Sequence, residues 1–245
     1  MRALGILLCT LAFPAIAHAE APTDDAPEPK KERRPKHGGL GYAAFGILAG
    51  PIGDMQDALV DTLGPGARSP GYGYTVGGGG RMLLFHRLVI GGKGFGLFPP
   101  EVGGPNGRAR IGGGGGGLEL GFAAVSRPKL LFFPYVGVGG FGLGLELENT
   151  SQDDIQLGDA DPLPPDEQRD YASGFVYLEV GAGLHRLIFW GDGGLAVGFN
   201  VGGMFSVAPS RWADGERELQ GLDEPRLSGA YLQLTIGGGG FYFKS

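Results

Sequence analysis

The chain has 245 residues, with 51 glycines, 18 prolines and a formal net charge of −6 at pH 7. Glycine is about a fifth of the chain against about 7% on average, and glycine and proline at this level often mark disorder. The pattern excludes disorder for most of the chain, because the glycines alternate with Val, Leu, Ile and Phe. The single cysteine, Cys9, lies in the N-terminal apolar stretch, so the mature chain is expected to lack disulfides and cysteine metal sites.

Residues 1–19 have the layout of a cleavable export signal. Arg2 provides a short positive region, residues 4–16 are apolar, and Ala17 and Ala19 place small side chains where a signal peptidase cuts. The apolar stretch is too short to span a bilayer as a helix. We therefore expect this segment to be removed on export.

Residues 20–37 are rich in proline and charge and have no apolar periodicity, so we expect a disordered tail. The basic run between Lys30 and Lys36 leaves two alternatives open. It binds an anionic surface such as lipid or cell-wall polymer, or it is part of a solvated linker balanced by neighbouring carboxylates.

The rest of the chain, residues 38–245, contains eight segments that alternate apolar residues with glycine or polar residues. Each is long enough to cross a membrane as a tilted strand, which needs about 9–11 residues. The expected strands cover residues 39–50, 71–85, 88–98, 109–125, 130–148, 172–187, 193–207 and 227–243.

Short and long connections alternate between these strands. The short turns are residues 85–87, 126–129 and 187–192, and the longer loops are 51–70, 99–108, 149–171 and 208–226. An up-and-down meander with this rhythm places all short turns and both ends of the barrel segment at one end. In bacterial outer-membrane barrels that end faces the periplasm.

The expected strand at 172–187 indicates which face is apolar. Val176, Leu178 and Val180 share one face, whereas the opposite face is mostly glycine and carries Glu179. Because glycine cannot fill a core, we expect the large apolar residues to face lipid and the glycine face to line the lumen.

The same rule, applied to the strand at 130–148, predicts a change of phase. Val136 and Val138 are expected outside, and so are the four apolar residues Phe141, Leu143, Leu145 and Leu147. Both sets can face lipid only if the alternation slips at Gly139–Gly140, as it does at a β-bulge.

These assignments predict a set of lumen-facing polar residues. The candidates are Glu119, Glu146, Glu148, Glu179, Asn200 and Gln233, with Lys93 and Arg110 as basic neighbours. Eight strands leave an interior that side chains just fill, yet inward glycines remove that filling. Two alternatives remain: ion and water networks fill the lumen, or a narrow passage favours cations.

The sequence offers little basis for chemistry. Of the three histidines in the mature chain, His37 lies in the tail, and His86 and His185 lie at short turns. No Ser–His–acid set gathers at the outer rim, so we expect no enzyme, no catalytic residue, no cofactor and no resident metal. The acidic loop 149–171 is interpreted as solvated surface, and loop 51–70 as a short helix begun by Asp54 over the barrel mouth, where an unknown protein partner could bind.

With eight alternating strands, an export signal and alternating loop lengths, residues 38–245 resemble the small eight-stranded outer-membrane β-barrel proteins of Gram-negative bacteria. The resemblance implies an all-β, eight-stranded antiparallel up-and-down transmembrane β-barrel located in the outer membrane. Such proteins end in an aromatic residue that the barrel-assembly machinery recognises, and Phe243 resembles it, although Lys244 and Ser245 follow. The expected partners are outer-membrane lipid and that machinery, and no nucleic acid.

The role expected for such a barrel is structural or interactive, through its exposed loops. Two alternatives stay open: a narrow cation-favouring channel for small solutes, and a soluble periplasmic barrel that binds a small apolar ligand.

Overall fold

The computed structural model describes residues 35–50, 56–68, 71–127, 129–190, 193–209, 211–214, 217–219 and 228–243. The expected signal segment, all but the last three residues of the expected tail, and Asp54 lie outside these residues. Residues 35–37, expected in the tail, are instead part of the first strand.

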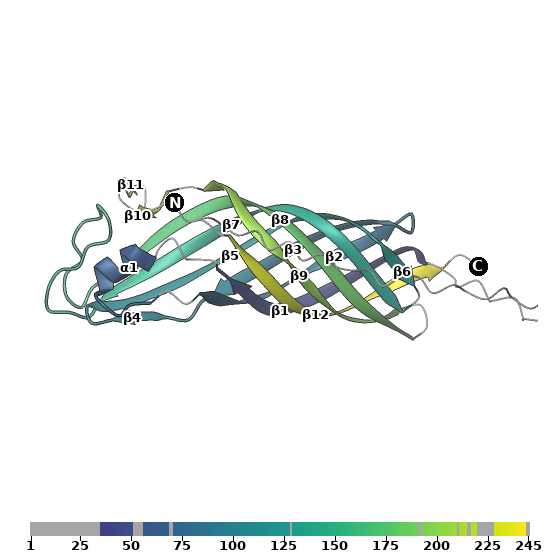
Figure 1. Cartoon of the computed structure of the whole chain (residues 1–245), viewed down its shortest axis with the longest axis horizontal. Coiled ribbons are helices and arrows are strands. Elements are labelled where there is room, and N and C mark those ends of the chain that lie inside the picture. The colour runs from purple at the N-terminus through teal and green to yellow at the C-terminus, as the bar shows by residue number, and fades with distance from the viewer. Residues whose placement is uncertain are drawn as a thin grey trace, which may run out of the picture. The chain divides into compact units, whose positions relative to one another are not determined.

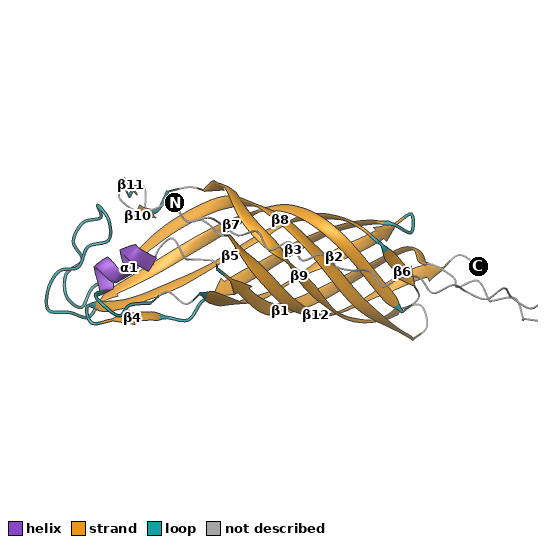
Figure 2. Cartoon of the chain, in the orientation of Figure 1, coloured by secondary structure: helices purple, strands orange, loops and turns teal. Residues whose placement is uncertain are grey.

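Eight long antiparallel strands close into a barrel (Figures 1 and 2). They are β1 (Pro35–Ala49), β2 (Tyr72–Leu84), β3 (Leu88–Phe98), β5 (Gly107–Phe122), β7 (Leu130–Asn149), β8 (Gln168–Trp190), β9 (Gly193–Pro209) and β12 (Ser228–Phe243). Each pairs with the next in the chain, and β12 pairs with β1 to close the ring. The predicted eight-stranded up-and-down barrel is confirmed.

Short elements lie at the connections. They are β4 (Val102–Gly104), β6 (Val125–Arg127), β10 (Ala213–Asp214), β11 (Arg217–Glu218) and one helix, α1 (Gln56–Leu63). Among the described residues, no helix combines the length and apolarity needed to cross a membrane.

Three strands that extend toward the long loops are much longer than a membrane crossing requires. β5 has 16 residues, β7 has 20 and β8 has 23, against about 9–11 for a crossing. They extend the barrel toward the end that carries α1, opposite the short turns (Figure 1). The loop expected to be simply solvated folds there, with Ile155, Leu157 and Leu163 buried in one apolar cluster with Leu59 and Leu63 of α1.

An apolar belt surrounds the outside of the barrel. Large hydrophobic side chains from all eight long strands are exposed there, among them Ile47, Met82, Ile90, Leu118, Val138, Val180, Val201 and Leu234. In a water-soluble barrel these residues would face inward. Their outward position defines a transmembrane barrel, with lipid against this belt.

Strand β7 contradicts the predicted phase slip. Its pairing with β5 and β8 is continuous through Gly139 and Gly140, and its odd-numbered side chains face inward along its whole length. The expectation that Phe141, Leu143, Leu145 and Leu147 face lipid is therefore wrong. They are buried inside the barrel because β7 keeps a single phase throughout, and they fill the interior as Leu131 and Phe133 do nearer the turns.

Candidate functional site

Three ion pairs join four charged side chains in the lumen. Arg81 of β2 donates from Nε to Glu119 Oε2 of β5 at 2.8 Å and from Nη2 to Oε1 at 3.2 Å. Lys93 of β3 lies 3.3 Å from Glu119 Oε1 and 2.5 Å from Glu179 Oε1 of β8. All four side chains are at most 7% exposed, so this lumen network is a desolvated four-charge cluster.

Glycines on the intervening strands bring these charges together. Arg81 pairs with Gly91, Gly91 with Glu119, Glu119 with Gly137, and Gly137 with Glu179. A Cβ on Gly91 would approach Arg81 Cγ to 2.8 Å, and one on Gly137 would approach Glu179 Oε2 to 3.1 Å. Each glycine therefore leaves the space that a charged side chain on the adjacent strand occupies.

Polar groups extend the lumen network on both sides. The hydroxyls of Tyr135 and Tyr231 both lie within hydrogen-bond distance of Glu179 Oε1 and of one another, and their two protons serve two of these three contacts. On the other side, Arg81 Nη1 lies 3.2 Å from Asn200 Oδ1 and 3.4 Å from His185 Nε2. The network thus links seven of the eight long strands: β2, β3, β5, β7, β8, β9 and β12.

Aromatic rings enclose the cations. The guanidinium carbon of Arg81 lies 4.6 Å from the Tyr42 ring centroid and 5.0 Å from that of Phe133, and Lys93 Nζ lies 5.2 Å from that of Tyr231. Cation–π contacts of this kind partly replace the lost water. Two cations face two carboxylates, so this section of the lumen carries no net formal charge.

Apolar rings fill the lumen on the loop side of the network. Phe141 stacks against Phe95 and Phe175 at centroid distances of 5.2 and 5.4 Å, and Tyr177 meets Phe95 edge-on at 6.2 Å. Inward glycines make room for these rings, since a Cβ on Gly115 would approach Phe141 Cδ2 to 2.7 Å. The inward glycines therefore accommodate large side chains and do not empty the lumen.

The structure brings four of the six lumen candidates inside. Glu119 and Glu179 form the network, Asn200 contacts Arg81, and Gln233 is buried and donates to Thr75 Oγ1 at 3.4 Å. Glu146 and Glu148 are not in the lumen, which corrects the prediction. Because β7 keeps its phase, both point outward beyond the membrane.

The two misplaced carboxylates belong to an outer cluster of exposed ion pairs. Glu146 pairs with Arg110 at 3.4 Å and Glu148 with Arg108 at 3.2 Å, so Arg110 is also outside and not a lumen residue. Arg110 Nε donates to Glu101 at 2.8 Å, and this hydrogen bond holds the pKa of the Glu101 carboxyl below its usual value.

Arg81 and His185 are among the lumen residues that the sequence does not predict. Arg81 follows four glycines, where no clear alternation marks its side, although Leu83 two residues later is inward. His185 was expected at a turn, but β8 runs on to Trp190, so its ring is buried in the lumen. Within the part of the chain described, no cluster of three His, Asp or Glu side chains could hold a metal ion.

Phe243, the expected assembly signal, is the last residue of β12 and pairs with Pro35 of β1. The orientation of its side chain lies outside the described part of the structure.

No known family model matches the chain, and no curated protein is similar in sequence. Among solved structures, the chain is similar to the attachment invasion locus protein Ail of Yersinia pestis, at 11% identity, 86% and 99% coverage of the two chains and a TM-score of 0.37. It is also similar to the outer membrane protease OmpT from Escherichia coli, at 9% identity, 84% and 96% coverage of the two chains and a TM-score of 0.36. The outer membrane protein AlkL is a further similar structure, at 10% identity, 91% and 98% coverage and a TM-score of 0.31. Strand pairing and side-chain facing define the class by themselves: a closed eight-stranded transmembrane β-barrel.

Proposed function

We propose that the chain is an integral outer-membrane protein with a structural or surface-interaction role, and that it neither conducts solutes nor catalyses a reaction. The observation that carries the proposal is the filled lumen. The neutral lumen network and the adjoining aromatic stack occupy consecutive sections of the barrel interior.

The cation-channel alternative loses its main support. It rested on four like charges along one path, but Glu146 and Glu148 are outside, and Glu119 and Glu179 are compensated by Arg81 and Lys93. A lumen lined by paired charges in close contact does not offer a continuous attractive path for a cation.

The loop end supports an interactive role. β5, β7 and β8 carry the barrel well past the apolar belt, and α1 and the loop after β7 pack into one buried cluster there. A folded extension of this kind presents a fixed surface outside the membrane, which suits recognition better than a mobile loop does.

The test is electrical. The mature protein, folded in micelles, is added to planar lipid bilayers, and folding is checked by the mobility difference between heated and unheated samples. We expect no discrete current steps. Single-channel steps that follow protein concentration would contradict the proposal, and a reversal potential in a salt gradient would then report the ion preference.

Location is tested separately. After fractionation of the source cell, the mature chain is expected in outer membranes and is expected to resist a carbonate wash. Recovery in the soluble periplasmic fraction would support the soluble-barrel alternative instead.

A further inference from the structure

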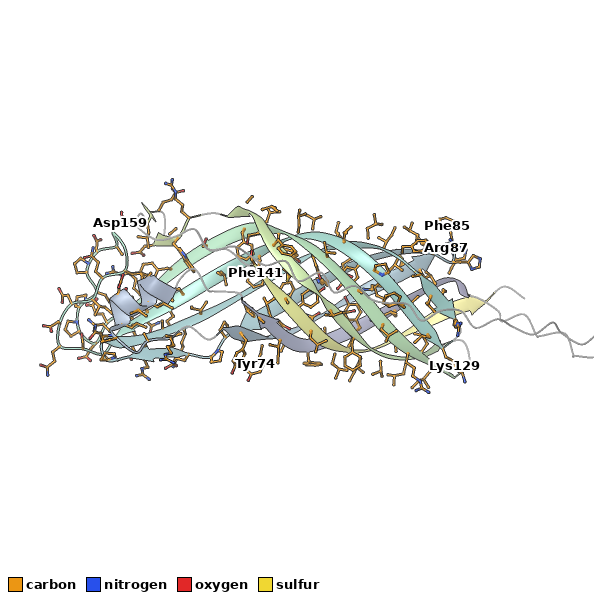
Figure 3. The ribbon with its side chains drawn as sticks, viewed as in Figure 1. Tyr74, Phe85, Arg87, Lys129, Phe141 and Asp159 are labelled. Carbon is orange, nitrogen blue, oxygen red and sulfur yellow. The ribbon has the colours of Figure 1, made fainter. Side chains whose placement is uncertain are left out.

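The short-turn end of the barrel carries a set of basic side chains that the lumen network does not involve. Arg87 lies in the turn between β2 and β3, Arg127 ends β6, Lys129 precedes β7, and Arg186 is near the end of β8. Figure 3 shows Arg87 and Lys129 at the end opposite to Asp159 of the folded loop. We call these four residues the basic rim.

The basic rim differs from the basic residues of the lumen and of the strand extensions. Arg81 and Lys93 are paired with carboxylates in the lumen, and Arg108 and Arg110 are paired beyond the belt. In the described structure, no ion pair involves a residue of the basic rim, and residues 82–90, 120–134 and 182–190 contain no Asp or Glu. Among the residues described at this end, no carboxylate compensates the positive charge of the basic rim.

Strand pairing directs part of the basic rim outward. Arg127 pairs with Leu130, and Leu130 pairs with Arg186, so the three side chains share one face of the sheet. Arg186 alternates with the exposed residues Leu184 and Ile188, which makes this the outer face. With strands about 4.8 Å apart, the two arginine backbones are about 10 Å apart, at the edge of the apolar belt.

A pocket of about 330 Å³ opens next to these residues, between the turn that joins β2 to β3 and the segment that joins β5 to β6. We call it the turn pocket; its lining is His86, Arg87 and residues 122–127. The Arg87 guanidinium lies 5.6 Å from the ring of Phe122, a belt residue, so its charge is held at the belt's edge. The Ser126 hydroxyl is buried with no hydrogen-bond partner among the described residues, which leaves a donor unsatisfied beside the pocket.

We propose that the turn pocket and the basic rim bind the phosphate of an anionic phospholipid in the leaflet at the short-turn end. Arginines suit a phosphodiester because the guanidinium donates two parallel hydrogen bonds to its oxygens. The acyl chains of the lipid would contact the apolar belt beside Phe122. The inference rests on the proposed membrane location and adds a specific lipid partner to it.

The assay measures lipid binding to the full mature chain in detergent by native mass spectrometry, with phosphatidylglycerol, phosphatidylcholine and inorganic phosphate as separate probes. Each basic residue near an anionic lipid surface contributes about a fivefold change in affinity. We therefore expect Arg87→Gln with Arg127→Gln to weaken phosphatidylglycerol binding by about tenfold or more. Arg87→Lys with Arg127→Lys keeps the charge and should retain most of it.

The matched control is Arg108→Gln with Arg110→Gln, which removes two arginines at the opposite end and should leave binding unchanged. Equal binding by the rim variant and the wild type, or equal loss in the control, would overturn the proposal. Displacement of the lipid by millimolar inorganic phosphate would make free phosphate the ligand and overturn the lipid assignment. Because the assay runs in detergent, its failure is distinct from failure of the location test.

Discussion

The two halves of β7 differ in the residues on their outer face. Nearer the turns this face carries exposed Val136 and Val138, whereas in the other half it carries the ion-paired Glu146 and Glu148. The inner face is apolar in both halves, with Phe133 buried in one and Leu145 in the other. The alternation itself does not change. The difference shows that the composition of the outer face follows the surrounding medium, apolar against lipid and charged beyond it, with outward Gly140, Gly142 and Gly144 between the two.

The largest effect is expected from a charge placed inside the outer half. Leu145→Glu should lower the free energy of unfolding by about 3–5 kcal/mol, because a buried carboxylate would lack a partner. Urea titration of the folded protein in micelles measures the change. The matched control, Glu146→Leu, lies on the outer face and loses one exposed ion pair, so it should change stability by about 1 kcal/mol or less. Equal cost at both positions would contradict the facing.

In the membrane half, the outer face is sensitive to charge as well. Val138→Arg should destabilise the barrel in lipid vesicles by roughly 2–4 kcal/mol, because it places a charge against hydrocarbon. Glu148→Arg, on the same face but beyond the belt, should cost far less. If Val138→Arg is tolerated as well as Glu148→Arg, lipid does not surround this half.

Neighbouring glycines allow a finer comparison. A Cβ on inward Gly139 would lie 2.5 Å from Tyr177 Oη and 2.3 Å from Gly116 O, whereas one on outward Gly140 meets nothing within 4 Å. Gly139→Ala should therefore cost about 1–3 kcal/mol through overpacking, and Gly140→Ala should be neutral or slightly stabilising. Chemical denaturation of the two variants side by side checks the difference.

The smallest effect concerns the outer cluster and pH. The Glu101 pKa is lowered by Arg110 from its ordinary value of 4.5, so the carboxylate contributes stability above that pH. The contribution is lost as the pH falls through the lower folded pKa. Glu101→Gln should therefore flatten the slope of the stability profile below about pH 4.5 and leave its slope near neutrality unchanged. An equal slope in both proteins below about pH 4.5 would count against the pairing.

Strand number, order and antiparallel closure were predictable, because alternation and turn spacing depend only on local sequence. The facing of the outer half of β7 was not, since a period of two says which residues share a face and not which face is inside. The change from Val136 and Val138 to Glu146 and Glu148 along one face was the available signal. The sequence did not predict Arg81 as a lumen residue, because its role depends on Glu119, which is 38 residues away in the chain and lies across Gly91 in the sheet.

The most direct measurement is thiol labelling along β7 in lipid vesicles. Cys9 lies in the segment expected to be removed, so single cysteines can be placed at Val136, Val138, Leu145, Glu146 and Glu148 without background. With a membrane-impermeant maleimide, cysteines at Glu146 and Glu148 should react, and those at Val136, Val138 and Leu145 should be protected, the first two by lipid and the third by the barrel interior. Labelling at Leu145 with protection at Glu146 would contradict the account, as would equal labelling at all five positions.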